Sequence, residues 1–369
     1  MNKIVFFLYV LFLLCFTFFS YLFIDPGLIY LRPLFTNFHQ THRMEVTSIF
    51  TLFIFLSFIF YFLCLHFIKK NQLTMKHICM LIGITAGILV FAYPAIVSFD
   101  IFNYIATAKV AYFYHENPYI IMPIEFTNDP LLLFMHAANK IALYAPVWIF
   151  LTRIPHILGF GNFLLTLLQF KVLVGLFYGT TVWLLWRMTK NSFKIAFFAL
   201  NPLVIFEIFV GGHNDIVMMF LFLVSAYFLF SKRIGKSVVS FIFSGLIKYA
   251  TLILTPLYVV SFFKTMSQKT FFFWATVGMY CIFFLSSLRE EIYPWYGIWF
   301  LLPASFLVGD NLITYVSLAF SFSLLLRYIP FMLLGTYFGP TPLLKILLTF
   351  VPVIVVLIAY CLKKQRILR

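Results

Sequence analysis

Residues 4–24 of the chain read IVFFLYVLFLLCFTFFSYLFI, a run without a charged side chain. A helix needs roughly 20 consecutive, mostly apolar residues to cross a bilayer, and this run is long enough. Backbone N–H and C=O groups in hydrocarbon must be paired within the segment, which favours helices. The sequence therefore predicts an all-α, polytopic membrane protein. Further runs of the same kind lie at residues 46–68, 78–97, 163–186, 215–230, 271–288 and 343–362.

Composition supports the same class. Hydrophobic residues make up 63% of the 369 residues and charged residues 10%, whereas soluble domains carry about 25% charged residues. The five cysteines lie inside or at the ends of apolar runs, so they predict no disulfide framework.

The formal net charge of +15 would by itself suggest a nucleic-acid partner. Here the basic residues lie in short loops between the apolar runs, which is the positive-inside pattern of membrane proteins. We therefore expect a lipid bilayer as partner, no nucleic acid, and these loops on the cytoplasmic side. The loop residues are Lys69, Lys70, Lys76, Arg187, Lys190, Lys194, Lys232, Arg233, Lys236, Lys264, Lys269, Lys363, Lys364, Arg366 and Arg369.

We expect a single integral-membrane domain over residues 1–369, with about eleven to thirteen membrane segments. Residues 98–161 form a long outer segment that is too apolar for a free loop and is expected to contain interfacial helices. Residues 237–263 lie between two basic clusters, so a single crossing would put one cluster outside. We favour two shorter helices that dip in and back, with the break near residues 245–255 and Pro256.

Within the outer segment, Asp129-Pro130 predicts the start of a helix that lies in the membrane interface. Aspartate is a favoured N-cap residue, and proline is favoured at the first helical position. The polar face of this helix would hold His136, Asn139 and Lys140, with leucine and phenylalanine residues on the other side.

A few polar residues stand where a membrane protein rarely places them. Ionisable groups at membrane depth are costly and usually line a cavity or pathway. Asp100, Asn103, Tyr104 and Thr107 would share one face of a helix, because they are spaced at i, i+3, i+4 and i+7. The simpler alternative is a carboxylate that only benefits from the dipole at a helix N-terminus.

The sequence Gly211-Gly212-His213-Asn214-Asp215 places an imidazole, an amide and a carboxylate at the outer start of a helix. Such a helix start attracts anions, although an Asn or Asp cap after a glycine turn would look the same. One histidine and a few carboxylates do not define a metal-ligand set. No cofactor is therefore predicted, and a divalent cation is left open.

Lys248 lies within an apolar stretch, too far from either end to reach the membrane surface easily, which favours a functional role over snorkelling. Arg289, Glu290 and Glu291 precede the aromatic residues 293–296. They form either a solvated turn or a second polar cluster at the outer surface.

Taken in order, these polar motifs resemble the GT-C glycosyltransferases, and most closely the bacterial polyprenyl-phosphate-mannose-dependent α-mannosyltransferases. The resemblance covers roughly residues 93–299. One departure is Tyr-Ala-Pro at residues 144–146 in place of the usual Tyr-Gly-Pro, which alters a turn and removes no chemical group. The motifs are Ser98-Phe99-Asp100-Ile101-Phe102-Asn103-Tyr104, Asn117-Pro118-Tyr119, Asn128-Asp129-Pro130, Tyr144-Ala145-Pro146-Val147-Trp148, Asn201-Pro202-Leu203, Gly211-Gly212-His213-Asn214-Asp215, Gly245-Leu246-Ile247-Lys248 and Pro294-Trp295-Tyr296.

The resemblance implies transfer of a hexose, expected to be mannose, from a polyprenyl-phosphate donor to a cell-envelope glycan or glycolipid. The reaction would occur at the outer face of the bacterial cytoplasmic membrane. The family's base is an acidic residue of the first outer loop, which gives that role to Asp100. Lys248, His213 and Arg289 are candidates for binding the departing phosphate. The other residues expected at the substrate site are Asn103, Tyr104, Asn117, Tyr119, Tyr144, Asn214, Asp215 and Trp295.

Two alternatives share some of these features. A transporter or flippase of a lipid-linked or small substrate would also contain buried charges and broken helices. Against it, no paired repeat is visible, and the acidic groups gather at the outer edge. An envelope polysaccharide polymerase would use a lipid-linked donor but transfer a larger unit.

Overall fold

The computed structural model describes residues 3–31, 37–289 and 291–368, which contain helices and no strands. The predicted all-α class is therefore confirmed. The α-helices are α1 (Lys3–Ser20), α2 (Phe38–Thr41), α3 (Arg43–Lys69), α4 (Met75–Leu89), α5 (Asp100–Tyr112), α6 (Pro146–Leu158), α7 (Phe163–Thr189), α8 (Ser192–Ala199), α9 (Pro202–Ile205), α10 (Asp215–Phe230), α11 (Ile234–Gly245), α12 (Thr255–Phe263), α13 (Gln268–Arg289), α14 (Gly297–Ala304), α15 (Leu312–Leu326), α16 (Tyr328–Leu334) and α17 (Thr341–Leu368).

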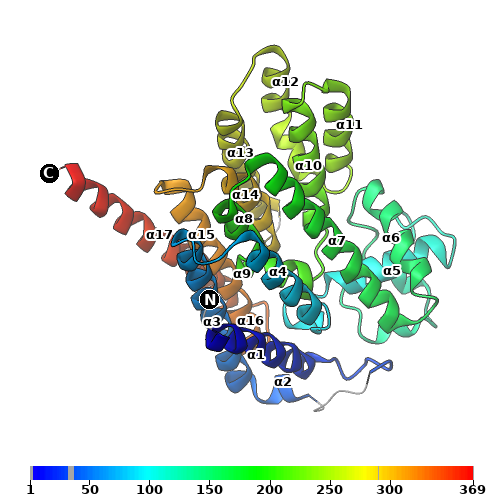
Figure 1. The fold of residues 1–369 in the computed structure, drawn as a ribbon. Coiled ribbons are helices and arrows are strands. Elements are labelled where there is room, and N and C mark those ends of the chain that lie inside the picture. Colours follow the sequence, from blue (N-terminus) through cyan, green and yellow to red (C-terminus); the bar gives the residue numbers. More distant parts are fainter. Residues whose placement is uncertain (1–2, 32–36, 290, 369) are drawn as a thin grey trace.

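Short 3₁₀ turns and one π-helix, η5, connect these helices (Figure 1). They are η1 (Tyr21–Phe23), η2 (Pro94–Ile96), η3 (Pro123–Glu125), η4 (Pro130–Leu133), η5 (Phe206–Val210), η6 (Tyr249–Leu254), η7 (Pro294–Tyr296) and η8 (Ser305–Leu307).

Six helical stretches in the described part of the chain are long and apolar enough to cross a membrane, and a bent pair, Ser192–Ala199 with Pro202–Val210, would make seven. The chain is thus a multi-pass membrane protein, but full-length spans are fewer than the eleven to thirteen segments expected. The other apolar runs form helices of 10–17 residues. Helix α10, for example, has 16 residues, or about 24 Å of length, which is shorter than a hydrocarbon core of about 30 Å.

The break predicted within residues 237–263 is present. Helix α11 ends at Gly245, and the chain continues through η6 into α12. A ring from each helix meets the other, with the ring centroids of Phe241 and Tyr258 4.2 Å apart. Ser244 and Thr251 also share a hydrogen bond of 3.0 Å between their hydroxyls, close to the tip. This pair forms a helical hairpin in place of one long helix.

The prediction of an interfacial helix after Asp129-Pro130 is wrong beyond the first turn. The cap is present, since the Asp129 carboxylate accepts a hydrogen bond of 3.0 Å from the Leu131 N–H, but only the 3₁₀ turn η4 follows. The predicted polar face of His136, Asn139 and Lys140 therefore does not form.

Residues 134–145 fold back on the rest of the outer segment instead of forming a helix. Two of their backbone groups pair with residues earlier in the outer segment: the Ala138 carbonyl accepts from the Ile124 N–H, and the Ala142 N–H donates to the Pro118 carbonyl. Asp129 is also bound by Lys109 of α5, at 2.8 Å. The helices that the outer segment does contain are α5 and α6.

The middle of the molecule is built from a broken helix. The Asn201 side chain accepts a hydrogen bond from Leu203 N–H, and Pro202 occupies the first helical position, so α8 ends and α9 begins there with a bend of 55°. The chain then passes through η5 and the Gly211-Gly212 turn into α10. All residues of η5 are buried, which places this segment in the core.

The junction between α6 and α7 is packed too tightly for any side chain at Gly159. A Cβ atom there would overlap the Thr166 side chain and approach its Cα at 2.9 Å. Thr166 cannot move freely, because its hydroxyl donates to the Asn162 carbonyl at 2.8 Å. We predict that Gly159→Ala lowers the free energy of unfolding by about 1–3 kcal/mol through overpacking.

The measurement is the thermal unfolding midpoint of the purified protein in detergent. The control is Gly83→Ala in α4, where a Cβ atom meets nothing within 4 Å and the higher helix propensity of alanine should stabilise slightly. Equal midpoints for the two variants would contradict the packing argument.

Candidate active site

Asp100 is the first residue of α5. Its backbone N–H donates to the Ser98 hydroxyl at 3.1 Å, and its side chain is 27% exposed. The start of α5 lies against the glycine turn before α10, since a Cβ atom on Gly212 would come within 2.6 Å of Ile101. Gly212 also has φ +70°, which suits glycine. Gly212 therefore lets the start of α5 approach the start of α10 in two ways: it has no Cβ atom, and it adopts a positive φ angle.

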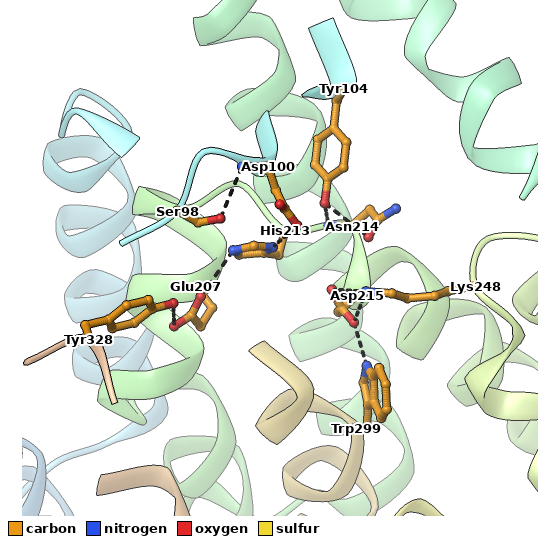
Figure 2. A network of polar contacts seen from close by, with 10 residues as sticks. All are labelled: Ser98, Asp100, Tyr104, Glu207, His213, Asn214, Asp215, Lys248, Trp299 and Tyr328. Carbon is orange, nitrogen blue, oxygen red and sulfur yellow. Dashed lines mark hydrogen bonds and ion pairs between the residues drawn. The ribbon is translucent and has the colours of Figure 1, made fainter. Parts of the chain in front are cut away.

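His213 lies between two carboxyl groups at this junction (Figure 2). Its Nδ1 is 3.7 Å from Asp100 Oδ2, and its Nε2 is 3.3 Å from Glu207 Oε2. The other oxygen of Glu207 accepts a hydrogen bond of 2.8 Å from the hydroxyl of Tyr328. These contacts form a polar chain of Asp100, His213, Glu207 and Tyr328, which we call the inner chain. It runs from a partly exposed carboxyl group into the core.

The imidazole of His213 is fully buried and stacks on the indole of Trp295, with ring centroids 4.0 Å apart. Burial lowers the pKa of His213, and the positive charge of Lys248 adds to the effect. Because the charged form is the one disfavoured, the imidazole is neutral at physiological pH.

A second polar group lies beside the inner chain and is built around Asp215, two residues after His213. The Asp215 carboxylate is fully buried and accepts from the Lys248 ammonium at 3.0 and 3.1 Å and from the Trp299 indole N–H at 2.5 Å. The ammonium also lies 5.1 Å from the ring centroid of Tyr296. Lys248 therefore does not snorkel: the hairpin tip brings it to the first residue of α10 (Figure 2).

Asn214 occupies the N-cap position of α10, but its side chain forms no capping hydrogen bond. Its side-chain oxygen accepts a hydrogen bond of 3.3 Å from the Tyr104 hydroxyl, so the amide faces α5. The ring of Tyr104 packs edge-on against Tyr144 and Trp148. The simple capping interpretation of this motif is therefore not what the structure contains.

Two predicted site residues lie away from these contacts. Asn117 is exposed, and its side chain accepts from the Tyr119 N–H at 3.0 Å in a local turn. The Tyr119 hydroxyl donates to the Tyr144 carbonyl at 2.8 Å, so it holds the outer segment together. The side chain of Arg289 and the whole of Glu290 lie outside the described residues.

Sequence reasoning missed Glu207, Trp299 and Tyr328. A signal for Glu207 was available, because it is an acidic residue within the apolar run that becomes α9 and η5. Nothing distinguished Tyr328 or Trp299 from other aromatic residues of a chain with 21% aromatic content.

Glu291 belongs to a second polar cluster, as one of the two alternatives for residues 289–291 predicted. Its carboxylate lies 2.7 Å from both the Arg327 guanidinium and the Lys345 ammonium. Arg327 directly precedes Tyr328, so this cluster adjoins the inner chain. No group of three or more His, Cys, Asp or Glu side chains within the described ranges is arranged to hold a metal ion.

Helices long and apolar enough to cross a membrane, with a buried polar network among them, define a polytopic membrane protein. Residues 24–264, more than half of the chain, match the family model described as MptA_B family, Alpha-(1->6)-mannopyranosyltransferase, N-terminal domain. The chain belongs to this mannosyltransferase family, and the resemblance stated above is confirmed. Comparisons with curated proteins and with solved structures found no match.

The pairing of Lys248 with Asp215 gives a stability prediction. In Lys248→Met the Asp215 carboxylate would stay fully buried without its cation, and we expect unfolding to become easier by about 3 kcal/mol. The double variant D215N/K248M has no buried charge and keeps an oxygen for the Trp299 indole, so it should recover much of the loss.

The thermal unfolding midpoint in detergent measures both variants. Lys236→Met, at an exposed position of α11, is the control and should change the midpoint little. A double variant as unstable as K248M alone would contradict the prediction that the loss comes from an unpaired Asp215 carboxylate.

Proposed function

We propose that the chain transfers mannose from a polyprenyl-phosphate donor to a cell-envelope glycan or glycolipid at the outer face of the bacterial cytoplasmic membrane, with Asp100 as general base. The observation that carries this assignment is a difference in exposure. Glu207 and Asp215 are fully buried, whereas the Asp100 side chain is 27% exposed at the head of the inner chain. Of these three carboxyl groups, only that of Asp100 is open to a substrate.

The reaction needs one proton acceptor and one stabilised leaving group. The acceptor hydroxyl gives its proton to the Asp100 carboxylate while its oxygen forms a bond to the anomeric carbon. The bond from that carbon to the phosphate oxygen breaks, and polyprenyl phosphate leaves with the electron pair. A positioned base typically contributes about 10²–10⁴-fold to such a step. Inversion at the anomeric carbon is expected by analogy with the family fold.

Lys248 is the candidate we favour for the phosphate. It is 23% exposed, and Asp215 and the ring of Tyr296 hold its ammonium in place, so it would meet the developing negative charge without reorganisation. His213 suits this role poorly, since it is fully buried and both ring nitrogens face carboxyl groups. Arg289 stays a candidate by the resemblance alone.

Asn103 and Asn214 stay candidates for the substrate site by the resemblance. The side-chain oxygen of Asn103 and the side-chain nitrogen of Asn214 are buried and form no hydrogen bond with any residue that the structure describes, so a ligand would reach them only after a local movement. Trp295 is not a free stacking platform, because the rings of His213 and Tyr293 stack on it. Its role is to hold His213.

Asp100→Asn tests the proposal. The amide keeps the shape of the side chain but cannot accept the proton, so we expect transfer of labelled mannose from polyprenyl-phosphate mannose to fall by about 10²–10⁴-fold. The assay uses membranes that contain the full chain, with the amount of folded protein measured for each variant.

Asp310→Asn is the matched control, because Asp310 is an exposed carboxylate paired with Lys363 at 2.9 Å. Equal transfer by D100N and wild type would remove Asp100 from the role of base. No transfer from any monosaccharide donor would favour a transporter or a polymerase instead. A parallel assay with EDTA decides whether a divalent cation is required.

A further inference from the structure

The two nitrogens of His213 pose a hydrogen-bonding problem. Both are buried, and neither forms a hydrogen bond with good geometry to any described residue. A buried polar atom without a partner costs about 1–3 kcal/mol. The groups that face the ring nitrogens are the carboxyl groups of Asp100 and Glu207, at 3.7 and 3.3 Å. The protonation of these three groups must therefore be settled together.

A neutral imidazole has one N–H donor and one acceptor nitrogen, whereas a charged imidazole has two donors. Three arrangements are available. A charged His213 would donate to two carboxylates. A neutral His213 could donate to Glu207 and accept from a protonated Asp100. In the third arrangement, a neutral His213 donates from Nδ1 to ionised Asp100 and accepts at Nε2 from a protonated Glu207.

The difference in burial between the three side chains favours the third arrangement. Glu207 and His213 have no exposed surface, but Asp100 is 27% exposed. An ionised carboxylate away from water is expensive, so the negative charge belongs on Asp100 and the proton on Glu207. The low pKa of His213, caused by burial and by Lys248, disfavours the charged imidazole.

The surrounding charges agree with this choice. Tyr328 of α16 donates its O–H to the far oxygen of Glu207, which therefore acts as the acceptor oxygen of a carboxylic acid. Among the described residues, the nearby charged groups are themselves paired: Asp215 with Lys248 at 3.0 Å, and Arg327, which precedes Tyr328, with Glu291 at 2.7 Å. Every hydrogen of the inner chain then points the same way, from Tyr328 towards Asp100.

We propose that Glu207 is a protonated carboxylic acid that donates its hydrogen to His213 Nε2 and so fixes the Nδ1–H of His213 towards Asp100. This inference rests on the proposed role of Asp100 as base. It makes His213 and Glu207 positioning residues, because neither contacts the reacting atoms. Its chemical consequence is that the N–H group facing the Asp100 carboxylate, at 3.7 Å, belongs to an uncharged imidazole. A cationic histidine in that place would make the carboxylate a weaker base.

A pair of Glu207 substitutions separates the arrangements. Glutamine has the shape of a protonated glutamate: its NH₂ group can donate to His213, and its oxygen can accept from Tyr328. Leucine has a similar size and does neither. We expect E207L to lower mannosyl transfer by on the order of 10²-fold, because the imidazole is no longer fixed, and E207Q to restore most of that loss. A charged His213 would instead need the anion, and E207Q would then fail like E207L.

Infrared difference spectroscopy gives a readout that does not depend on activity. The spectrum of wild type minus E207Q in detergent at neutral pH should contain a carboxylic-acid C=O stretching band that shifts in D₂O. Carboxylate bands in its place would overturn the inference. This measurement also decides the matter if E207L does not fold.

Asp100→Asn in the same series keeps the two proposals apart. If D100N is inactive and E207Q is as poor as E207L, the protonated glutamate is wrong and the base assignment stands. If D100N transfers mannose normally, the base assignment is wrong, whatever the Glu207 variants do.

Discussion

Removing an ionisable side chain from water carries a cost that only a partner inside the protein can offset. That constraint organises the middle of this chain. Glu207, His213 and Asp215 have no exposed surface, and each meets a polar group from a distant part of the sequence. Tyr328 reaches Glu207 from α16, and Lys248 reaches Asp215 from the hairpin tip. Pairing requirements thus determine which helices must come together here.

The regular and the broken helices differ in what surrounds them. Long spans such as α3 and α17 consist mostly of apolar residues, and only 11% of the most apolar stretch of α17 is buried inside the protein. The broken segments, α8 to η5 and the hairpin of α11 and α12, lie among other helices or fold on themselves. Irregular backbone at membrane depth is tolerated where protein covers it, and η5 is buried throughout. Glu207, His213 and Lys248 lie on or next to this irregular backbone.

The sequence was sufficient for the helical class, the helix starts at Asp100 and Asp215, and the break after Gly245, because each depends on local chemistry. It could not give the pairing of Lys248 with Asp215, since these residues meet only through the folding of the hairpin. The predicted helix after Asp129-Pro130 does not form; backbone groups of this segment instead pair with those of residues 118 and 124, which local chemistry does not predict. Glu207 was readable as an isolated acid in an apolar run, but its partners were not.

The relative orientation of Glu207 and His213 depends on the π-helix η5, because this segment sets the number of residues in the turn between them. Its closing hydrogen bond runs from Gly211 N–H to the Phe206 carbonyl, five residues back, so the turn holds one more residue than an α-turn would. Removing a single residue from 208–210 would let the segment wind as an ordinary α-helix. Glu207 and His213 would then be rotated relative to each other, although no contact residue had been substituted. In this segment the length of the chain is as strictly constrained as the identity of its side chains.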